Sequence, residues 1–215
     1  MIQIKRMADY DHDIRDDVAD VFVDGYYRNL SFFTKDRTKL KAAFCNLFCP
    51  DVFYVAEVDG EIVGILACSN NRQPAMAIDK PSLKEAFGFL MGSMAYLTLD
   101  KEFNAVLPYE DDTGYIECVA TSERARGKGV STALFKHVMQ ELPYRHYILE
   151  VVDTNVVALQ MYKNLGFDIY ERKQEKLSRI KGFKERIYMK WSKGGVSDLP
   201  VDLFSCKRLH GLFYS

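Results

Sequence analysis

A glycine-containing loop between an apolar run and an amphipathic run limits the folds open to this chain. The apolar run is YIECVA at 115–120, the loop is SERARGKG at 122–129, and the amphipathic run is VSTALFKHVMQEL at 130–142. A strand that leads through such a loop into a helix leaves backbone N–H groups at the positive end of the helix dipole, which suits an anion. Gly127 and Gly129 also lack the Cβ atoms that would hold a phosphate away from the backbone. The alternative is an ordinary helix start that happens to carry two glycines.

The neighbours of these glycines favour an anion. Arg124, Arg126 and Lys128 bring positive charge to the loop, and the hydroxyl groups of Ser131 and Thr132 add hydrogen-bond donors. The loop is therefore a candidate phosphate site.

Two common phosphate-binding patterns do not fit these letters. The P-loop requires glycine where the chain has Ser122, and serine or threonine where it has Gly129. The dinucleotide fingerprint requires a third glycine where the chain has Thr132. The pattern that remains is R-x-x-G-x-G, formed by Arg124, Gly127 and Gly129, and it suits a pyrophosphate bound without a nicotinamide or a metal.

A second motif follows in EVVDTNVVALQMYKNLGF at 150–167. Asn155 or one of the two residues before it can cap a helix, and Gly166 can close it. Helical spacing then places Asn155, Ala158 and Tyr162 on one face, with an amide at one end and a phenol at the other. The alternative is that Tyr162 belongs to the core and Asn155 serves only as a cap.

Apolar periodicity over the rest of the chain predicts strands interleaved with helices. Strands are expected over 2–7, 114–121, 147–152, 167–173 and 184–192, a hairpin over 52–68 with its turn at Asp59-Gly60, and helices over 13–30, 36–48, 82–103, 127–142 and 155–165. This order predicts a mixed α/β sheet.

The two motifs, in this order and in these elements, resemble the GNAT superfamily of acyl-CoA N-acyltransferases. The resemblance is strongest over 114–172, and the order of elements over 2–68 agrees with it. It implies a mixed, mostly antiparallel central sheet that is flanked by helices and splayed at its central parallel strands. One GNAT domain is then expected over 1–193, with an inserted helical segment at about 69–113.

The residues beyond this domain, 194–215, form a tail of uncertain order and role. Its apolar side chains could dock on a sheet edge or on a second subunit of a homodimer.

The resemblance also implies acetyl-CoA as the acyl donor. Pantetheine would lie between the strands 114–121 and 147–152 and pair with main-chain groups as an added strand would, while the glycine loop would take the pyrophosphate. The residues expected to bind the donor are Val119, Ala120, Thr121, Arg124, Arg126, Gly127, Lys128, Gly129, Val130, Ser131, Asn155, Ala158 and Tyr162.

Two side chains are the candidate catalytic groups. The resemblance implies that Tyr162 protonates the departing thiolate, and a phenol suits this role because it keeps its proton at neutral pH. Glu117 is the candidate base for the amine, directly or through water; the alternative is an ordinary surface or salt-bridged glutamate. Strand alternation predicts Tyr115, Glu117 and Val119 on one face and Cys118 on the other, within the core.

The acceptor would be recognised by whatever covers the thioester site. Candidates are the helices over 13–48 and the inserted segment, whose apolar residues could equally fill the core. Those residues are Phe87, Phe89, Leu90, Met94 and Tyr96. The acids at 110–112 could attract a cationic amine or form a solvated turn.

Composition excludes several classes of partner. With 29 basic and 30 acidic residues the net charge is −1, so neither nucleic acid nor a membrane surface is expected as a partner. The longest apolar stretches are too short to span a bilayer, and the N-terminus lacks the apolar run of a secretory signal, so a cytoplasmic protein is expected. The five cysteines are scattered and no residues have metal-ligand spacing, which predicts no metal.

These observations favour an acetyl-CoA-dependent N-acetyltransferase that transfers an acetyl group directly to a primary amine, expected to be that of a small molecule. The first alternative is a non-catalytic acyl-CoA sensor or regulatory module of the same fold. The second is an α/β module that binds another phosphate ligand, which the failed P-loop and dinucleotide patterns disfavour.

Overall fold

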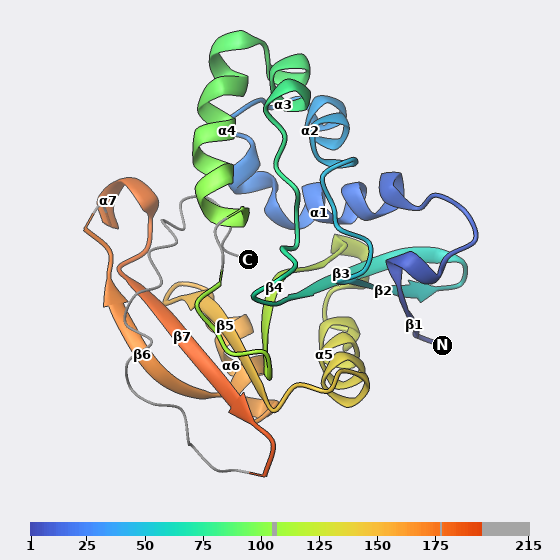
Figure 1. The fold of residues 1–215 in the computed structure, drawn as a ribbon, viewed down its shortest axis with the longest axis vertical. Helices are drawn as coiled ribbons and strands as arrows, with labels where there is room; N and C mark the ends of the chain where they lie inside the picture. The colour runs from blue at the N-terminus through green and yellow to red at the C-terminus, as the bar shows by residue number, and fades with distance from the viewer. Residues whose placement is uncertain (105–106, 177, 195–215) are drawn as a thin grey trace.

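A computed structural model describes residues 1–104, 107–176 and 178–194 (Figure 1). In this part of the chain seven strands form one sheet in the order β1-β2-β3-β4-β5-β7-β6. The strands are β1 (Gln3–Arg6), β2 (Phe53–Val58), β3 (Glu61–Ser69), β4 (Thr113–Thr121), β5 (His146–Val152), β6 (Asp168–Gln174) and β7 (Glu185–Ser192). Every neighbouring pair is antiparallel except β4 and β5. The predicted mixed, mostly antiparallel sheet is confirmed.

Helices cover both faces of this sheet (Figure 1). One face carries α1 (Arg15–Leu30), α2 (Arg37–Phe44), α3 (Lys80–Phe87) and α4 (Phe89–Phe103), whose buried side chains share a core with β2, β3 and β4. The other face carries α5 (Val130–Glu141) and α6 (Val156–Asn164), which form a second core with β2 to β5 and β7. Each face buries enough apolar surface to hold its helices on the sheet.

The two parallel strands pair over a short distance only. Their register runs from Thr113 opposite His146 to Ile116 opposite Leu149, although β4 continues to Thr121 and β5 to Val152. The two strands therefore separate beyond Ile116, which agrees with the predicted splay of the central parallel strands.

A β-bulge in β4 overturns the predicted alternation. Glu117 lies opposite Ala67 on β3 but Ala120 lies opposite Ile65, so β4 contains one extra residue between them. Cys118 sits at this point with a φ of +53°. The bulge turns Cys118 toward the core under α1 and α4, while Val119 joins the core under α5. The prediction that Val119 shares a face with Glu117 and that Cys118 lies opposite is therefore wrong.

The predicted hairpin turn is confirmed, and α2 begins at a capping residue. Asp59 and Gly60 have φ values of +52° and +80°, as a tight hairpin turn requires. Asp36 caps α2 by accepting hydrogen bonds from the backbone N–H groups of Thr38 and Lys39.

Some predicted helices change, and one further helix is present. The helix expected over 82–103 divides into α3 and α4 at Gly88, whose φ of +80° interrupts the helix. The helix expected from 127 begins at Val130, because the two loop glycines also have positive φ. A short helix, α7 (Ser178–Lys181), was not predicted. All of the predicted tail except Gly194, that is 195–215, lies outside the described residues.

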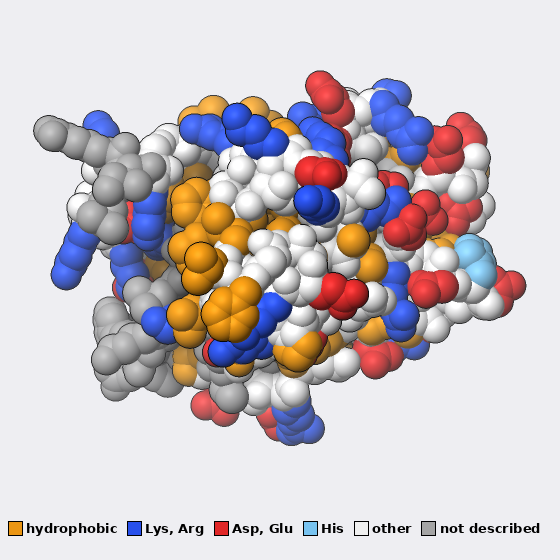
Figure 2. All heavy atoms as spheres, turned by 90° about the horizontal axis from the view of Figure 1, so that it is seen from above, with side chains coloured by type: hydrophobic (Ala, Val, Ile, Leu, Met, Phe, Trp, Pro, Cys, Tyr) orange, Lys and Arg blue, Asp and Glu red, His pale blue; other side chains and the backbone are white. Residues whose placement is uncertain are grey.

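The inserted segment exposes part of its apolar surface. Phe87 and Tyr96 pack against the core, as the filler interpretation predicted. Phe89 and Leu90 are instead 71% and 83% exposed. Apolar side chains gather on part of the face seen in Figure 2. Only part of this segment fills the core.

Candidate active site

The end of β4, the glycine loop and α6 form an open groove. Its lining residues are Gly25, Val119, Ala120, Thr121, Arg126, Ser131, Asn155, Val157, Ala158, Met161 and Tyr162. Most of the residues predicted to bind the acyl donor therefore lie together, although they come from separate stretches of the sequence. A Cβ on Gly25 would lie 2.5 Å from Cβ of Ala120, so the absent side chain lets α1 approach the strand.

The glycine loop presents an open backbone to solvent. Gly127 and Gly129 have φ values of +74° and +78°, and a Cβ at either position would meet no described atom within 4 Å. Gly129 is the N-cap of α5, and the first N–H groups of a helix have no acceptor within it. The Ser131 hydroxyl lies 2.8 Å from that of Thr121, at the same edge of the groove. This arrangement suits an anion.

The three basic residues of the loop take different positions. Arg126 lies along the groove, with Nε donating to the carbonyl of Thr121 (3.3 Å). Arg124 instead pairs with Glu61 of the β2–β3 hairpin at 2.6 Å, outside the groove. Lys128 is exposed on the loop. Of the predicted basic contacts, the structure brings only Arg126 into the groove lining.

Val130 and Asn155 meet the groove in different ways. The side chain of Val130 is buried, where a Cβ on Gly64 would lie 2.4 Å from it, so only its backbone could reach a ligand. Asn155 caps α6, its Oδ1 accepting from the backbone N–H of Ala158 (3.1 Å). The predicted cap is confirmed, and the amide nitrogen remains as the donor that Asn155 could offer a ligand.

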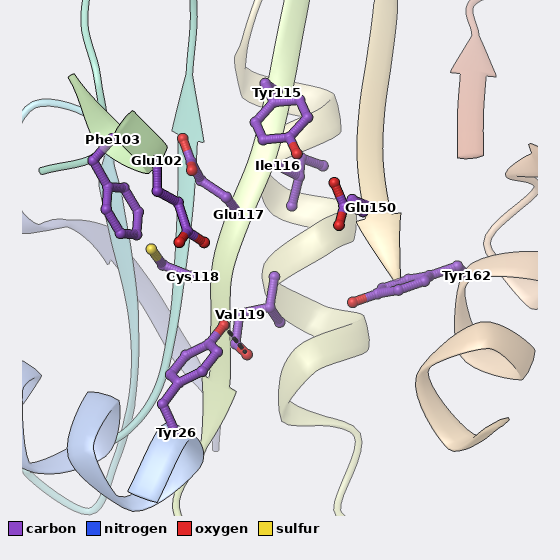
Figure 3. A pocket seen from close by; sticks show the side chains of 10 residues that line it. All are labelled: Tyr26, Glu102, Phe103, Tyr115, Ile116, Glu117, Cys118, Val119, Glu150 and Tyr162. Carbon is purple, nitrogen blue, oxygen red and sulfur yellow. Dashed lines mark hydrogen bonds between the residues drawn. The ribbon is translucent and has the colours of Figure 1, made fainter. Parts of the chain in front are cut away.

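An inner cavity adjoins the groove (Figure 3). Its volume is about 50 Å³. Its lining residues are Tyr26, Glu102, Phe103, Tyr115, Ile116, Glu117, Cys118, Val119, Glu150 and Tyr162. Val119 and Tyr162 line both the cavity and the groove, so a molecule could react across this boundary.

Tyr162 stands at that boundary. Its ring is buried against Phe135 and Phe167, with centroids 5.3 and 6.2 Å away. The hydroxyl is directed into the cavity (Figure 3). Burial raises the pKa of Tyr162 above its ordinary value, so the phenol holds its proton at neutral pH.

Comparison with known proteins identifies the family to which this protein belongs. The family model described as "Acetyltransferase (GNAT) family" matches residues 16–167. The chain belongs to the GNAT acetyltransferase family. The predicted resemblance is confirmed.

Individual relatives of this GNAT chain are distant. The uncharacterized N-acetyltransferase MJ1530 of Methanocaldococcus jannaschii is 26% identical over 141 residues, which cover 64% of this chain. The chain spans 65% of the length of that relative.

Two solved structures share the fold. One is described as histone acetyltransferase HPA2 and related acetyltransferase, from Corynebacterium glutamicum; it has a TM-score of 0.56 and 21% identity, and the match covers 92% of this chain and 98% of that one. The other is the ribosomal-protein-S18-alanine N-acetyltransferase of Escherichia coli, with a TM-score of 0.54, 13% identity and coverage of 93% and 99%. At these identities the likeness establishes the fold alone.

Three glutamates line the inner cavity of this GNAT protein, and only Glu117 was predicted. Glu117, on β4, accepts a hydrogen bond from the hydroxyl of the buried Ser69. Glu102 comes from α4 and is 4% exposed. Glu150, on β5, forms a 2.6 Å ion pair with Arg186 of β7. Burial raises the pKa of Glu150, and the guanidinium of Arg186 opposes this rise.

Sequence reasoning missed Glu102 and Glu150, whereas Tyr26 belongs to the 13–48 helices that were candidates to cover the site. Glu150 is the single charge in the apolar strand YILEVV, which was an available signal because a charge within a buried strand needs a reason. Glu102 lies in the last turn of a helix, where a surface glutamate looks the same in sequence. The Tyr26 hydroxyl donates to the carbonyl of Val119 at 3.2 Å, a contact across 93 residues that no local pattern reveals.

The acids at 110–112 were expected either to attract a cationic amine or to form a solvated turn, and the structure shows the turn. Asp111 is exposed, accepts a hydrogen bond from Asn71 and pairs with Arg72. None of the three residues lines the inner cavity.

Neither a membrane span nor a metal site is visible where the chain is described. Within those residues no helix has both the length and the apolar character needed to cross a bilayer. The same residues contain no group of three or more histidine, cysteine or acidic side chains placed to hold a metal ion.

Proposed function

We propose that this protein is an acetyl-CoA-dependent N-acetyltransferase that transfers an acetyl group directly to the primary amine of a small molecule. The observation that carries the proposal is the junction of the groove and the cavity at Tyr162. A donor in the groove and an acceptor in the cavity would meet beside a buried phenol.

The chemistry of the groove lining supports acetyl-CoA as the ligand. The loop backbone around Gly127 and Gly129, together with Arg126, would take the pyrophosphate. Main-chain groups of β4 past Ile116, where its pairing with β5 stops, would take the pantetheine amides, with Asn155 as a further donor. Bound there, acetyl-CoA supplies a thioester whose acyl carbon an amine can attack.

The chain would contribute acid–base groups to the transfer. Tyr162 would protonate the departing sulfur, a role supported by its raised pKa. A cavity carboxylate would take a proton from the incoming ammonium, since only the neutral amine has the lone pair needed to attack. Glu117 is the candidate from the sequence, and the structure adds Glu150.

The cavity lining favours a cationic acceptor of small size. Among the described lining residues three are glutamates and none is lysine, arginine or histidine. Negative lining attracts an ammonium ion, and the buried walls leave room for an amine-bearing chain more readily than for a folded protein surface.

A non-catalytic acyl-CoA sensor of the same fold is the alternative. A sensor would use the groove but has no need of a buried acid beside carboxylates. The Tyr162 environment therefore supports the enzyme over the sensor.

The test is titration calorimetry with acetyl-CoA, CoA and ATP in parallel, with thiol release followed across a panel of amines. Binding of both CoA species but not ATP, with amine-dependent thiol release, is the expected result. CoA binding with no release by any amine would support the sensor. Binding of ATP alone would contradict the interpretation of the glycine loop.

A further inference from the structure

A buried ion pair lies at the wall of the inner cavity, and its Arg186 side has no role in the function proposed above. Arg186 Nη1 donates to Glu150 Oε1 at 2.6 Å. The two side chains are 9% and 7% exposed. Glu150 also lines the cavity, so the pair joins the reaction space to β7.

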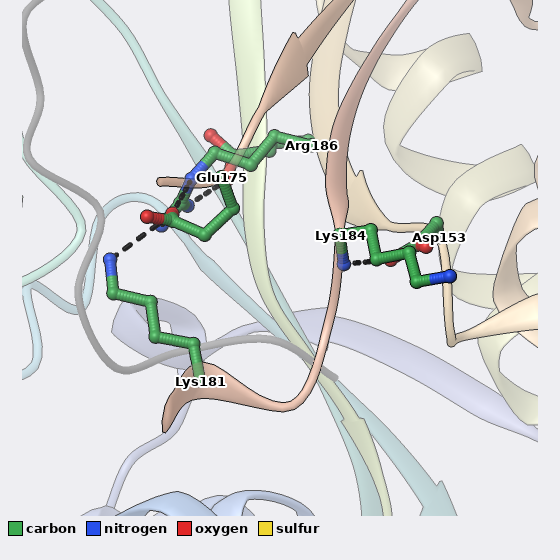
Figure 4. Close-up of polar contacts among 6 residues, drawn as sticks. Asp153, Glu175, Lys181, Lys184 and Arg186 are labelled. Atoms are coloured by element: carbon green, nitrogen blue, oxygen red, sulfur yellow. Dashed lines mark hydrogen bonds and ion pairs between the residues drawn. The ribbon is translucent and has the colours of Figure 1, made fainter. Parts of the chain in front are cut away.

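The guanidinium continues into a second carboxylate (Figure 4). Arg186 Nε and Nη2 donate to Glu175 Oε2 at 3.2 and 3.1 Å. Lys181 donates to the same oxygen at 3.1 Å. A line of alternating charges thus runs from Glu150 in the cavity wall through Arg186 and Glu175 to Lys181.

Stability gives a poor reason for such a pair. Removing two charges from water costs several kcal/mol per ion, and apolar residues of similar volume commonly stabilise a fold as well or better. A more exposed ion pair, between Arg172 of β6 and Glu185 of β7 at 2.7 Å, lies on the neighbouring strands. The position of Glu150 at the cavity therefore indicates a chemical role.

We propose that Glu150 is the base that takes a proton from the acceptor ammonium, and that Arg186 is the positioning residue that keeps this carboxylate charged and oriented. The inference rests on the proposed function. It deepens that function by choosing between the cavity carboxylates.

The proton and bond changes balance in this scheme. Glu150 takes one proton from the ammonium, which leaves a neutral amine. The amine nitrogen bonds to the acyl carbon, and the carbon–sulfur bond breaks. Tyr162 protonates the sulfur, and the second proton lost by nitrogen restores the phenol. The products are the amide, the free thiol and protonated Glu150, which releases its proton to water.

Geometry favours Glu150 over Glu117. Figure 3 places Glu150 on the side of the cavity that holds Tyr162, whereas Glu117 lies with Glu102 on the other side of Tyr115.

Charged and titratable groups reach Glu150 from every neighbouring element. Burial raises the pKa of Glu150, while Arg186 and the Tyr188 hydroxyl from β7 and Lys173 from β6 oppose this rise. The further groups around it are Tyr115 and Glu117 of β4, Glu102 of α4, Tyr162 of α6, and Glu175 behind Arg186.

The experiment is the pH dependence of kcat with one saturating amine, so that ionisation of the free amine is common to all variants. Arg186→Met removes the cation, raises the pKa of Glu150 and should move the acidic limb up by about 1–3 pH units. Glu175→Gln removes an anion behind the same guanidinium, so the limb should move down. Arg172→Met breaks the exposed pair and should leave the limb in place.

Substitution of the carboxylates completes the test. Glu150→Gln should lower kcat by about 100-fold or more with little change in the Kd of acetyl-CoA, and Glu117→Gln should keep the acidic limb. The inference is overturned if Glu117→Gln removes the limb while Glu150→Gln retains it. A loss of kcat in Arg186→Met that is equal at every pH would assign Arg186 a structural role only.

Two arms keep the outcome decisive. If Arg186→Met does not fold, Arg186→Lys and Glu175→Gln still test the limb, and a limb that stays fixed in both contradicts the proposal. If the unmodified protein releases no thiol with any amine, the proposed function itself fails. Thiol release with an unaltered profile in Glu150→Gln defeats only the inference about Glu150.

Discussion

Tyr162 combines two properties that separate a catalytic acid from an ordinary core aromatic. Its ring has the packing of a core residue, against Phe135 and Phe167, yet its hydroxyl is directed into a cavity. Packing fixes the oxygen in space, and burial keeps the proton on it.

Tyr162→Phe isolates the hydroxyl, because phenylalanine keeps the ring and its packing. We expect kcat to fall by about 100-fold while the Kd of acetyl-CoA stays nearly unchanged. Stopped-assay thiol release and calorimetry measure the two quantities separately. A large loss of affinity with unaltered turnover would contradict the assignment.

Glu102 brings a carboxylate to the cavity from the inserted segment. Under the proposed function, Glu102→Gln should raise KM for a diamine about tenfold, since a hydrogen bond to a charged group contributes about 1.5–3 kcal/mol, and change KM little for a monoamine. Glu110→Gln, in the exposed turn, is the matched control and should change neither value. Equal effects of Glu102→Gln on the KM of both amines would show that Glu102 does not bind the second ammonium group of the diamine.

Individual site residues differed in how far sequence could identify them. Tyr162 and Asn155 belong to a local motif in which spacing along one helix implies a shared face. Glu150 and Glu102 have no such motif, because their meeting depends on how β5 and α4 pack in three dimensions. The local pattern therefore identified the face of α6 and the glycine loop before α5, whereas tertiary packing determined the other site residues.

At the scale of elements, the bulge in β4 shows why strand alternation misled. One extra residue at Cys118 reverses the facing of everything after it. No glycine marks the place, so the letters YIECVA look like a regular strand. The loop before α5 differs from the bulge, because its two glycines are a visible signal in the sequence for backbone with positive φ.

Gly129→Asp tests the loop, since an aspartate would add a negative charge where an anion is expected to bind. Acetyl-CoA affinity should fall at least about tenfold, by charge repulsion and a blocked approach to the backbone. Gly60→Asp is the matched control, since Gly60 has a φ of +80° and open space around it but lies in the β2–β3 turn. It should leave the Kd unchanged. Equal affinity in both variants would refute the anion site.

At the scale of the whole molecule, the order of strands and helices was readable and the shape of the insertion was not. The sheet follows from apolar periodicity and from a family likeness that covers 16–167. Gly88 lay inside a continuous apolar pattern, where a glycine is often tolerated within a helix. The break there follows from the packing of α3 on α4, where a Cβ on Gly92 would lie 2.4 Å from the carbonyl oxygen of Leu83.

Buried tyrosines predict how the folded state responds to alkali. Burial raises the pKa of Tyr147 and Tyr162 above their unfolded value near 10. Above pH 10 the unfolded chain therefore loses these protons first, and the stability present at lower pH declines as pH rises toward the folded values. The decline is up to about 1.4 kcal/mol per pH unit for each tyrosine.

Urea unfolding between pH 9 and 11 measures this loss of stability. Tyr162→Phe, which removes one of the two groups, should show a shallower decline than the unmodified protein. An identical slope in the variant would mean that Tyr162 does not contribute.

The two halves of the sheet are joined by the short pairing between β4 and β5. In the described part of the chain only four residue pairs, Thr113 to Ile116 with their partners, connect these strands. A donor bound between the strands beyond Ile116 would add further contacts between the two halves. Amide hydrogen exchange should then slow together at Val119–Thr121 and at Val151–Val152 when acetyl-CoA is added. Because acetyl-CoA would both react and connect the two halves of the sheet, the sheet should become more rigid when acetyl-CoA binds and less rigid when CoA leaves, once in each turnover.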